Sequence, residues 1–561
     1  MSYRIKIAFF GLLFGFSLVI LRLFYWQVVK ADELSAMGKS QYGSSITISS
    51  ERGDIKTSDG FPIATNKISY LVFANPKEIK EKDTFSQNIS PLLEVDKASI
   101  SAQLRLDRFW VPLKRGISLQ QKEVIEKMKL PGVGFEEESV RFYPEASLAA
   151  QIVGFVGKDD SGEDTGYFGL EGYYDRQLKG KSITTVKIRD ALGRPIIAQQ
   201  EQGAYNQKGR SLVLHIDRAI QYLVEKKLNE AVEKYGASGG MVGIIEPKTG
   251  NIIAMASNPS FDQRHFQEYT ADLYKNPFIT NAYEPGSTFK ALVMAAGINE
   301  KKVKADTKCP ICAKPIEIGG YEIRTWNNTY IEHITMADVI MHSDNTGMVY
   351  VAQSLGLDTM LSYFQQFGIG ENTGIDLQGE VAPILRERSQ WYPIDLATAG
   401  FGQGISVTPI ELLSGFAAIA NNGIRMEPHV VSKIETEDGQ TLHIEPKVLG
   451  KPISEKSAKV MTEILVHAVH KGEAQFARVK GYRIAGKTGT AQIPIEGHYD
   501  PHKTIASFIG FAPANDPKFA MLVIIDRPTT SIYGAETAAP LFFNISKDLL
   551  TYYDISPTED E

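Results

Sequence analysis

The sequence predicts a C-terminal α+β domain with an antiparallel sheet and a helical subdomain, preceded by a second folded region and one membrane-spanning helix. Three observations support this prediction. Residues 7–29 carry a single charge among mostly apolar side chains. At 561 residues the chain is too long for one ordinary core. In its second half, strand-like runs lie on both sides of a helical stretch, as in a sheet that joins both ends of one domain.

The composition is that of a folded protein and excludes several classes. Hydrophobic residues make up 43% and charged residues 22% of the chain, which does not suit a disordered protein. The net charge is -6 and there is no dense block of Lys and Arg, so nothing indicates a surface that binds nucleic acid. We therefore expect no nucleic-acid partner. Two cysteines are too few for a disulfide scaffold.

The apolar residues 7–29 are long enough to span a membrane, with Arg22 near one end of the span. Arg4 and Lys6 lie in the short segment 1–6 and favour a cytoplasmic N-terminus. The alternative is a secretory signal peptide, but no clear small-x-small cleavage site follows. We therefore expect an uncleaved, single-pass anchor in the cell membrane, with nearly all of the remaining chain outside the cytoplasm.

Residues 30–206 are predicted to form a non-catalytic domain. Short strand-like runs, such as 46–49 and 70–74, alternate with glycine-punctuated turns, and a helical stretch is expected at 119–129. Nothing in this region has the clustered His, Glu and Asp residues of a catalytic site. The sequence therefore predicts a structural module here.

Residues 207–555 are predicted to form the second domain, and 556–561 an acidic tail. Strands are expected at 211–216, 241–245, 251–255, 504–511 and 519–525. Helices are expected at 218–235, 336–355, 358–367 and 539–552. A further helix is expected to begin at or beside Ser287, because a proline and a glycine directly precede it.

The segment Ser287-Thr-Phe-Lys290 opens this last helix. Positions three apart share a helix face, so the two side chains can meet. A serine hydroxyl needs an adjacent base to act as a nucleophile, and a lysine can serve if burial or a neighbouring cation lowers its pKa. Ser287 is therefore the candidate nucleophile and Lys290 the candidate base. The backbone N–H of Ser287 can contribute to an oxyanion site.

The second motif is Ser343-Asp344-Asn345, at the end of a predicted helical run. Ser343 can relay a proton between Lys290 and a leaving group, which makes it a third catalytic candidate. Asn345 offers an amide that can hold the backbone of a peptide substrate.

The third motif is Lys487-Thr488-Gly489-Thr490, on or just after a predicted strand. All four residues are candidates for substrate binding. Lys487 adds a cation that helps to keep Lys290 neutral and attracts a carboxylate. Gly489 permits a close approach of the substrate. Thr490 offers its hydroxyl to that carboxylate and its backbone N–H to the oxyanion.

Two features lie outside these motifs. Cys309-Pro-Ile-Cys312 lacks the two further ligands of a zinc site, so we expect no metal; a local disulfide and two free thiols both remain open. Tyr499, His502 and Lys503 follow the third motif; an exposed loop is expected for them, and the lining of the cleft is the alternative.

The three motifs, in this order, are the signature of serine β-lactamases and penicillin-binding proteins. The chain resembles the class B, monofunctional penicillin-binding proteins over nearly its whole length. The similar segments outside the trio are residues 22–28, Arg52-Gly53-Asp54-Ile55 with Asp59-Gly60, residues 169–175 and residues 402–412. Tyr283-Glu284-Pro285-Gly286 and residues 404–409 are closer to the division and spore-septum type.

This resemblance implies a penicillin-binding transpeptidase fold on an elongated pedestal. It also implies a D,D-transpeptidase that cross-links peptidoglycan stem peptides through a Ser287 acyl-enzyme, releases D-alanine and is acylated by β-lactams. No cofactor is expected. The implied partners are stem peptides, β-lactams, a membrane glycan polymerase and other septal proteins.

Two alternatives use the same chain differently. A β-lactam hydrolase or D,D-carboxypeptidase would use water as the acceptor, but it would need neither the anchor nor the long non-catalytic domain. A non-catalytic septal scaffold would have no need of the intact trio.

Overall fold

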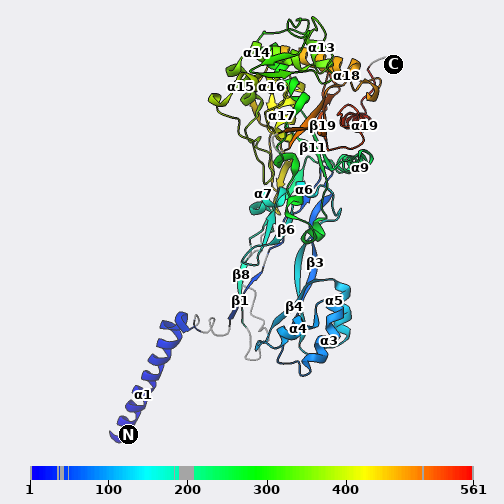
Figure 1. Cartoon of the computed structure of the whole chain (residues 1–561). Helices are drawn as coiled ribbons and strands as arrows, with labels where there is room; N and C mark the ends of the chain where they lie inside the picture. Colours follow the sequence, from blue (N-terminus) through cyan, green and yellow to red (C-terminus); the bar gives the residue numbers. More distant parts are fainter. Residues whose placement is uncertain are drawn as a thin grey trace. The chain divides into compact units, whose positions relative to one another are not determined.

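The computed structural model (Figure 1) describes residues 3–34, 37, 43–48, 50–181, 183–188, 208–495 and 498–558. The chain divides into two compact units. Unit 1 consists of Met1–Arg52, Asn66–Val140 and Lys179–Gly209. Unit 2 consists of Gly53–Thr65, Arg141–Leu178 and Arg210–Glu561. The predicted domain boundary at residue 206 and the last three residues of the predicted acidic tail lie outside the described residues.

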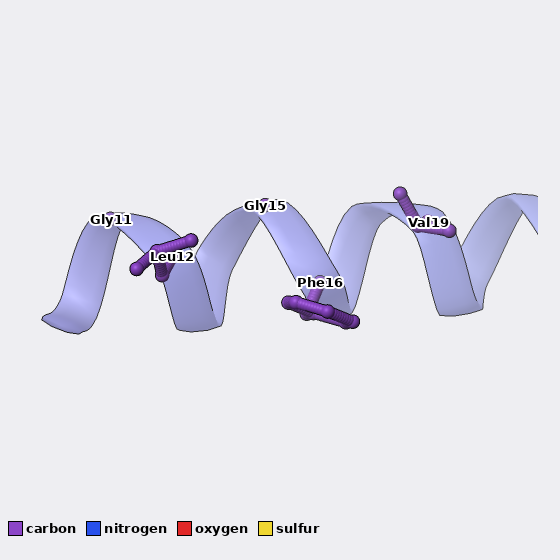
Figure 2. Close-up of a pocket in the computed structure, with 5 residues that line it drawn as sticks. All are labelled: Gly11, Leu12, Gly15, Phe16 and Val19. Atoms are coloured by element: carbon purple, nitrogen blue, oxygen red, sulfur yellow. The ribbon is translucent and has the colours of Figure 1, made fainter.

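Helix α1 (Tyr3–Phe24) continues as one π-helical turn, Tyr25–Val29. Within the described part of the chain, it is the one helix long and apolar enough to cross a membrane. A shallow groove on this helix, drawn in Figure 2, is lined by Gly11, Leu12, Gly15, Phe16 and Val19. The two glycines are four residues apart and leave the backbone open on one side, a spacing that suits close packing of membrane helices.

The folded part of unit 1 combines strands with three helices. Strands β4 (Val111–Ile117) and β5 (Val133–Phe142) both pair with the long β3 (Pro62–Ala74). The helices that share their core are α3 (Lys82–Leu93), α4 (Lys97–Leu104) and α5 (Leu119–Lys127). The helix predicted at 119–129 is therefore confirmed, and a capping box on Ser118 fixes its start. Strands β1 (Gly43–Ile48) and β8 (Ile183–Ile188) form a separate antiparallel pair.

A buried ion pair joins two glycine-containing segments in unit 2. Arg141 Nε donates to Glu171 Oε1 at 2.7 Å, and the two side chains are 5% and 0% exposed. Arg141 Nη1 also donates to the carbonyl oxygen of Gly53 at 2.8 Å. Gly53, from the segment Arg52-Gly53-Asp54-Ile55, and Glu171, from residues 169–175, therefore both bind the guanidinium of Arg141.

Glu171→Ala should lower the free energy of unfolding by about 3–5 kcal/mol, because it removes a buried carboxylate that lies 2.7 Å from the buried Arg141 guanidinium. The matched control is Asp516→Ala, which breaks the exposed pairs of Asp516 with Lys248 at 2.7 Å and with Lys518 at 2.8 Å and should cost at most about 1 kcal/mol. Urea unfolding of the detergent-solubilised protein measures both values. Equal losses would contradict a structural role for the buried pair.

The core of unit 2 is a five-stranded antiparallel sheet in the order β11-β10-β20-β19-β18. The strands are β10 (Gly239–Ile245), β11 (Ile252–Asn258), β18 (Ala485–Ile495), β19 (His498–Ala512) and β20 (Phe519–Asp526). Two strands come early in the domain and three come late, so the sheet joins both ends of the domain, as predicted (Figure 1).

Both faces of this sheet are covered, which explains the unbroken apolar run of β20. One face packs with α9 (Arg218–Tyr235) and α19 (Ala538–Tyr552), and its β20 residues are Met521, Val523 and Ile525. The other face belongs to the core of the helical subdomain, and its β20 residues are Ala520, Leu522 and Ile524. Alternate side chains of a strand point to opposite faces, so a strand buried on both sides is apolar throughout.

The helical subdomain surrounds α17 (Pro409–Ala420), a helix whose residues are all buried. Its other helices are α12 (Lys290–Asn299), α13 (Met336–Met341), α14 (Asn345–Leu355), α15 (Leu357–Phe367), α16 (Pro393–Ala399) and α18 (Glu455–Lys471). A helix that is apolar on all sides is typical of a core position. Cys309 and Cys312 form a disulfide in the segment between α12 and α13.

Two predicted elements are wrong in detail. The helical stretch expected over 336–355 consists of two helices, α13 and α14, because Ser343 has a left-handed backbone with a φ of 55°. The second motif does follow the end of one helical run, α13, as expected. Tyr499, His502 and Lys503 are exposed, as expected, but they belong to strand β19, which pairs with β18 down to His498, and not to a loop. Backbone hydrogen bonds sustain a hairpin whatever the polarity of its side chains, so the end of the apolar run does not mark the end of the strand.

The remaining elements of unit 2 are short. Strands β16 (Thr441–His443), β15 (Val431–Glu435), β9 (Ser211–Leu214) and β2 (Ile55–Lys56) pair in this order, and β2 pairs in turn with the first residues of β3. The other strands are β6 (Phe155–Lys158), β7 (Asp164–Tyr167), β12 (Ile316–Ile318), β13 (Tyr321–Ile323), β14 (Arg425–Met426) and β17 (Val448–Gly450). The other α-helices are α6 (Ala150–Val153), α7 (Gly169–Tyr173), α8 (Asp175–Leu178), α10 (Ala271–Tyr274) and α11 (Pro277–Thr280).

Candidate active site

Ser287 lies on a 3-10 turn, Gly286–Phe289, that leads directly into α12. The α-helix itself begins at Lys290, so the helical start expected at Ser287 is present but is wound more tightly than an α-helix. In a 3-10 turn, side chains three residues apart are eclipsed, which aligns Ser287 with Lys290. Ser287 is partly exposed, whereas Lys290 is fully buried.

The side-chain nitrogen of Lys290 is held by the second motif. Its Nζ donates to the carbonyl oxygen of Ser343 at 2.6 Å and to Asn345 Oδ1 at 2.8 Å, and Ser343 Oγ lies at 3.4 Å. These contacts join the N-terminus of α12 to the loop between α13 and α14. The structure therefore brings together Lys290, Ser343 and Asn345, three of the residues predicted for the site.

The environment of Lys290 favours the neutral amine. Burial, and to a smaller extent the Lys487 cation, lower the pKa of Lys290 to about 7, although the negative charges of Asp344 and Glu473 act in the opposite direction. A lysine with a pKa near neutrality can accept a proton at physiological pH. Burial, not the second lysine, is thus the larger cause of the shift.

The loop that carries Ser343 and Asn345 is fixed by capping. Asp344 Oδ1 accepts the backbone N–H of Gly347 at 2.9 Å and thereby caps α14. Asn345 Nδ2 donates to the carbonyl oxygen of Arg324 at 2.9 Å. A side-chain amide has two N–H donors, so Asn345 keeps one for a substrate carbonyl.

The third motif lies within β18, with Lys487 opposite Ile509 and Gly489 opposite Ser507 on β19. Lys487 is buried, and its Nζ donates to Thr488 Oγ1 at 3.0 Å. Thr490 Oγ1 accepts the backbone N–H of Gly534 at 3.0 Å, which leaves the hydroxyl proton free to bind a substrate oxygen.

The space beside Gly489 is filled by the protein itself. A Cβ at this position would lie 2.4 Å from Ser507 Oγ and 2.8 Å from Thr288 Cγ2. Glycine at this position therefore lets β18 approach the turn that carries Ser287.

Sequence reasoning singled out the segment that contains Glu284 but gave Glu284 no role of its own. Glu284 precedes Ser287 by three residues, and its carboxylate accepts the Tyr499 hydroxyl at 3.1 Å. Burial raises the pKa of Glu284 and also raises the pKa of Tyr499 to about 12. This bond ties the arm of the β18–β19 hairpin to the Ser287 segment.

Sequence reasoning also missed Glu473, whose Oε2 accepts the Thr488 hydroxyl at 3.0 Å. No motif marks Glu473, because it lies in a loop after α18 and reaches the site only through the fold. Among the described residues, no group of three or more His, Cys, Asp or Glu side chains is arranged to hold a metal ion.

Two family models match the chain. The model described as "Penicillin binding protein transpeptidase domain" matches residues 240–547. The model described as "Penicillin-binding Protein dimerisation domain" matches residues 47–214. The first covers the sheet and the helical subdomain, with all three motifs.

Relatives match over nearly the whole length. The chain is 32% identical to Stage V sporulation protein D of Bacillus subtilis (strain 168), over 98% of this chain and 86% of the relative. It is 29% identical to peptidoglycan D,D-transpeptidase FtsI of Escherichia coli (strain K12), over 99% of this chain and 93% of the relative.

A solved structure has the same fold. Penicillin Binding Protein 2X from Streptococcus thermophilus superposes with a TM-score of 0.75 at 23% identity, over 91% of this chain and 80% of the other chain. The matched models, the full-length relatives and this fold agree with one another. The chain therefore belongs to the class B penicillin-binding proteins, with a dimerisation domain ahead of a transpeptidase domain.

Proposed function

We propose that this chain is a peptidoglycan D,D-transpeptidase that acts in septal wall synthesis. The observation that carries the proposal is the buried, near-neutral Lys290, held between Ser343 and Asn345 beside the partly exposed Ser287. This arrangement supplies a nucleophile and a proton acceptor in one place. The relatives named as D,D-transpeptidases and as a sporulation protein support the same conclusion.

The reaction has two acyl-transfer steps. Ser287 Oγ gives its proton to Lys290 and attacks the carbonyl carbon between the two D-alanines of a stem peptide. The C–N bond breaks, the terminal D-alanine leaves with a proton, and the peptide remains as an ester on Ser287. An amine of a second stem peptide then attacks the ester, which forms the cross-link and returns the hydroxyl.

The other predicted residues bind and polarise the substrate. The hydroxyl of Ser343 passes the proton toward the leaving amine, and the free N–H of Asn345 holds the peptide backbone. Lys487 and Thr490 attract the terminal carboxylate. Thr488 and Gly489 shape the strand on which the substrate lies, and the backbone N–H groups of Ser287 and Thr490 form the oxyanion hole.

Helix α1 anchors the protein in the cell membrane. Arg4 and Lys6 precede its apolar run and favour a cytoplasmic N-terminus. The Cys309–Cys312 disulfide is consistent with an oxidising location for the rest of the chain. A membrane glycan polymerase and other septal proteins would contact the anchor and the dimerisation domain.

Labelling with a fluorescent penicillin, followed by peptide mass spectrometry, tests this function. The wild-type protein should carry one stable adduct, on Ser287, and Ser287→Ala should carry none. The control Ser161→Ala removes an exposed serine outside the site and should label like wild type. An adduct on another residue, or rapid hydrolysis of penicillin at many turnovers per second, would contradict the proposal.

A further inference from the structure

Glu473 lies behind the strand that carries the third motif. It follows the C-terminus of α18, which packs along β18. Its carboxylate oxygen Oε2 accepts the Thr488 hydroxyl proton at 3.0 Å. The motif strand is therefore bonded to a carboxylate on the α18 side.

The bond continues to the buried lysine of the motif. Lys487 Nζ donates to Thr488 Oγ1 at 3.0 Å and to the Thr488 carbonyl oxygen at 3.2 Å. A hydroxyl has one proton and two lone pairs, so donating to Glu473 leaves Thr488 able to accept from Lys487. The chain of bonds runs in one direction, from ammonium to hydroxyl to carboxylate.

The surroundings of this chain are mostly apolar. A cavity of about 10 Å³ lies beside it, with Met341, Val469 and Phe508 among its lining residues. Of the residues that line this cavity, Glu473 and Lys487 carry ionisable side chains. Charges interact more strongly in such surroundings than in water, so the carboxylate acts on the lysine at short range.

We propose that Glu473 is a positioning residue of the acyl-transfer site. It anchors Lys487 and Thr488 through these hydrogen bonds and supplies the counter-charge of Lys487. The inference rests on the proposed function, because Lys487 is the residue expected to hold the substrate carboxylate.

The electrostatics agree with the geometry. Burial lowers the pKa of Lys487, and the negative charge of Glu473 opposes that effect. Glu473 also raises the pKa of Lys290, together with Asp344, while Lys487 lowers it. One carboxylate thus favours the charged form of both lysines and opposes the effect of burial on each.

The test is the pH dependence of penicillin acylation in the full-length protein. Glu473→Gln keeps an oxygen that can accept the Thr488 proton but removes the charge. Removing the negative charge lowers the pKa of both lysines. The acid limb, where Lys290 loses its proton, and the alkaline limb, where Lys487 loses its proton, should therefore both move to lower pH, the alkaline limb by about one unit and the acid limb by less. Glu473→Asp keeps the charge and should retain the wild-type limbs.

The control is Glu463→Gln, on the exposed side of α18, where Glu463 pairs with Arg483 at 2.7 Å. It should leave the profile unchanged. If Glu473→Gln matches wild type in both limbs, Glu473 does not tune the site and the inference fails, even if the melting temperature falls. If wild-type protein is not acylated on Ser287 at all, the proposed function fails instead.

Discussion

Lys290→Ala should lower the rate of Ser287 acylation by penicillin about 10²–10⁴-fold, the range that a general base contributes. The loss follows from geometry, because Lys290 follows Ser287 by one 3-10 turn and its Nζ is bonded to Ser343 and Asn345. Stopped-flow or quenched labelling with a fluorescent penicillin measures the rate.

The lowered pKa of Lys290 also predicts the acid limb of the pH–rate profile for acylation of the wild-type protein. The base must be neutral to accept the proton of Ser287. Since the pKa of Lys290 is lowered to about 7, the neutral fraction grows as pH rises through 7. The acylation rate should rise over that interval and then stay level until the alkaline limb, where Lys487 loses its proton, begins.

Lys302→Ala is the matched control, because Lys302 is exposed just beyond the end of α12. It should keep the wild-type rate and profile. If Lys290→Ala acylates at the wild-type rate, Lys290 is not the base. If it retains a limb near pH 7, another group must produce that limb.

The helices and strands of this fold were predictable where capping or turn residues lie at the ends of a regular apolar pattern. Helix α9 was expected at 218–235 and has those bounds, since Asp217 caps its start and Gly236 ends it in a left-handed conformation. The runs at 504–511 and 519–525 were correctly predicted as strands of one sheet with 241–245. The three motifs also identified Lys290, Ser343 and Asn345, which the structure places in contact.

The missed features depend on contacts between residues far apart in the chain. Glu473 reaches Thr488 only because α18 packs along β18. Glu284 meets Tyr499 across 215 positions. The left-handed backbone of Ser343 separates α13 from α14, and helical periodicity alone does not reveal such a residue. Local patterns therefore predicted the elements and the motifs but not the side chains that support the motifs.

A supporting contact of this kind lies at Gly402, which touches the turn that carries Ser287. The backbone N–H of Gly286 donates to the carbonyl oxygen of Gly402 at 3.0 Å. Gly402 has a φ of 81°, and a Cβ there would lie 2.2 Å from the Gly286 oxygen. A backbone oxygen so close cannot be displaced without moving the turn.

Gly402→Ala should therefore lower the acylation rate about 10²-fold, the cost of moving a nucleophile by about 1 Å. Gly439→Ala is the matched control, because Gly439 has a φ of 83° and open space around it. That variant should lose only the about 1–2 kcal/mol of a left-handed alanine and keep the wild-type acylation rate. Labelling rates and urea unfolding, measured on both variants, separate the two effects. Equal acylation would mean that the Gly402 segment yields without moving Ser287, whereas a loss confined to Gly402→Ala would show that backbone contact with Gly286 positions the nucleophile.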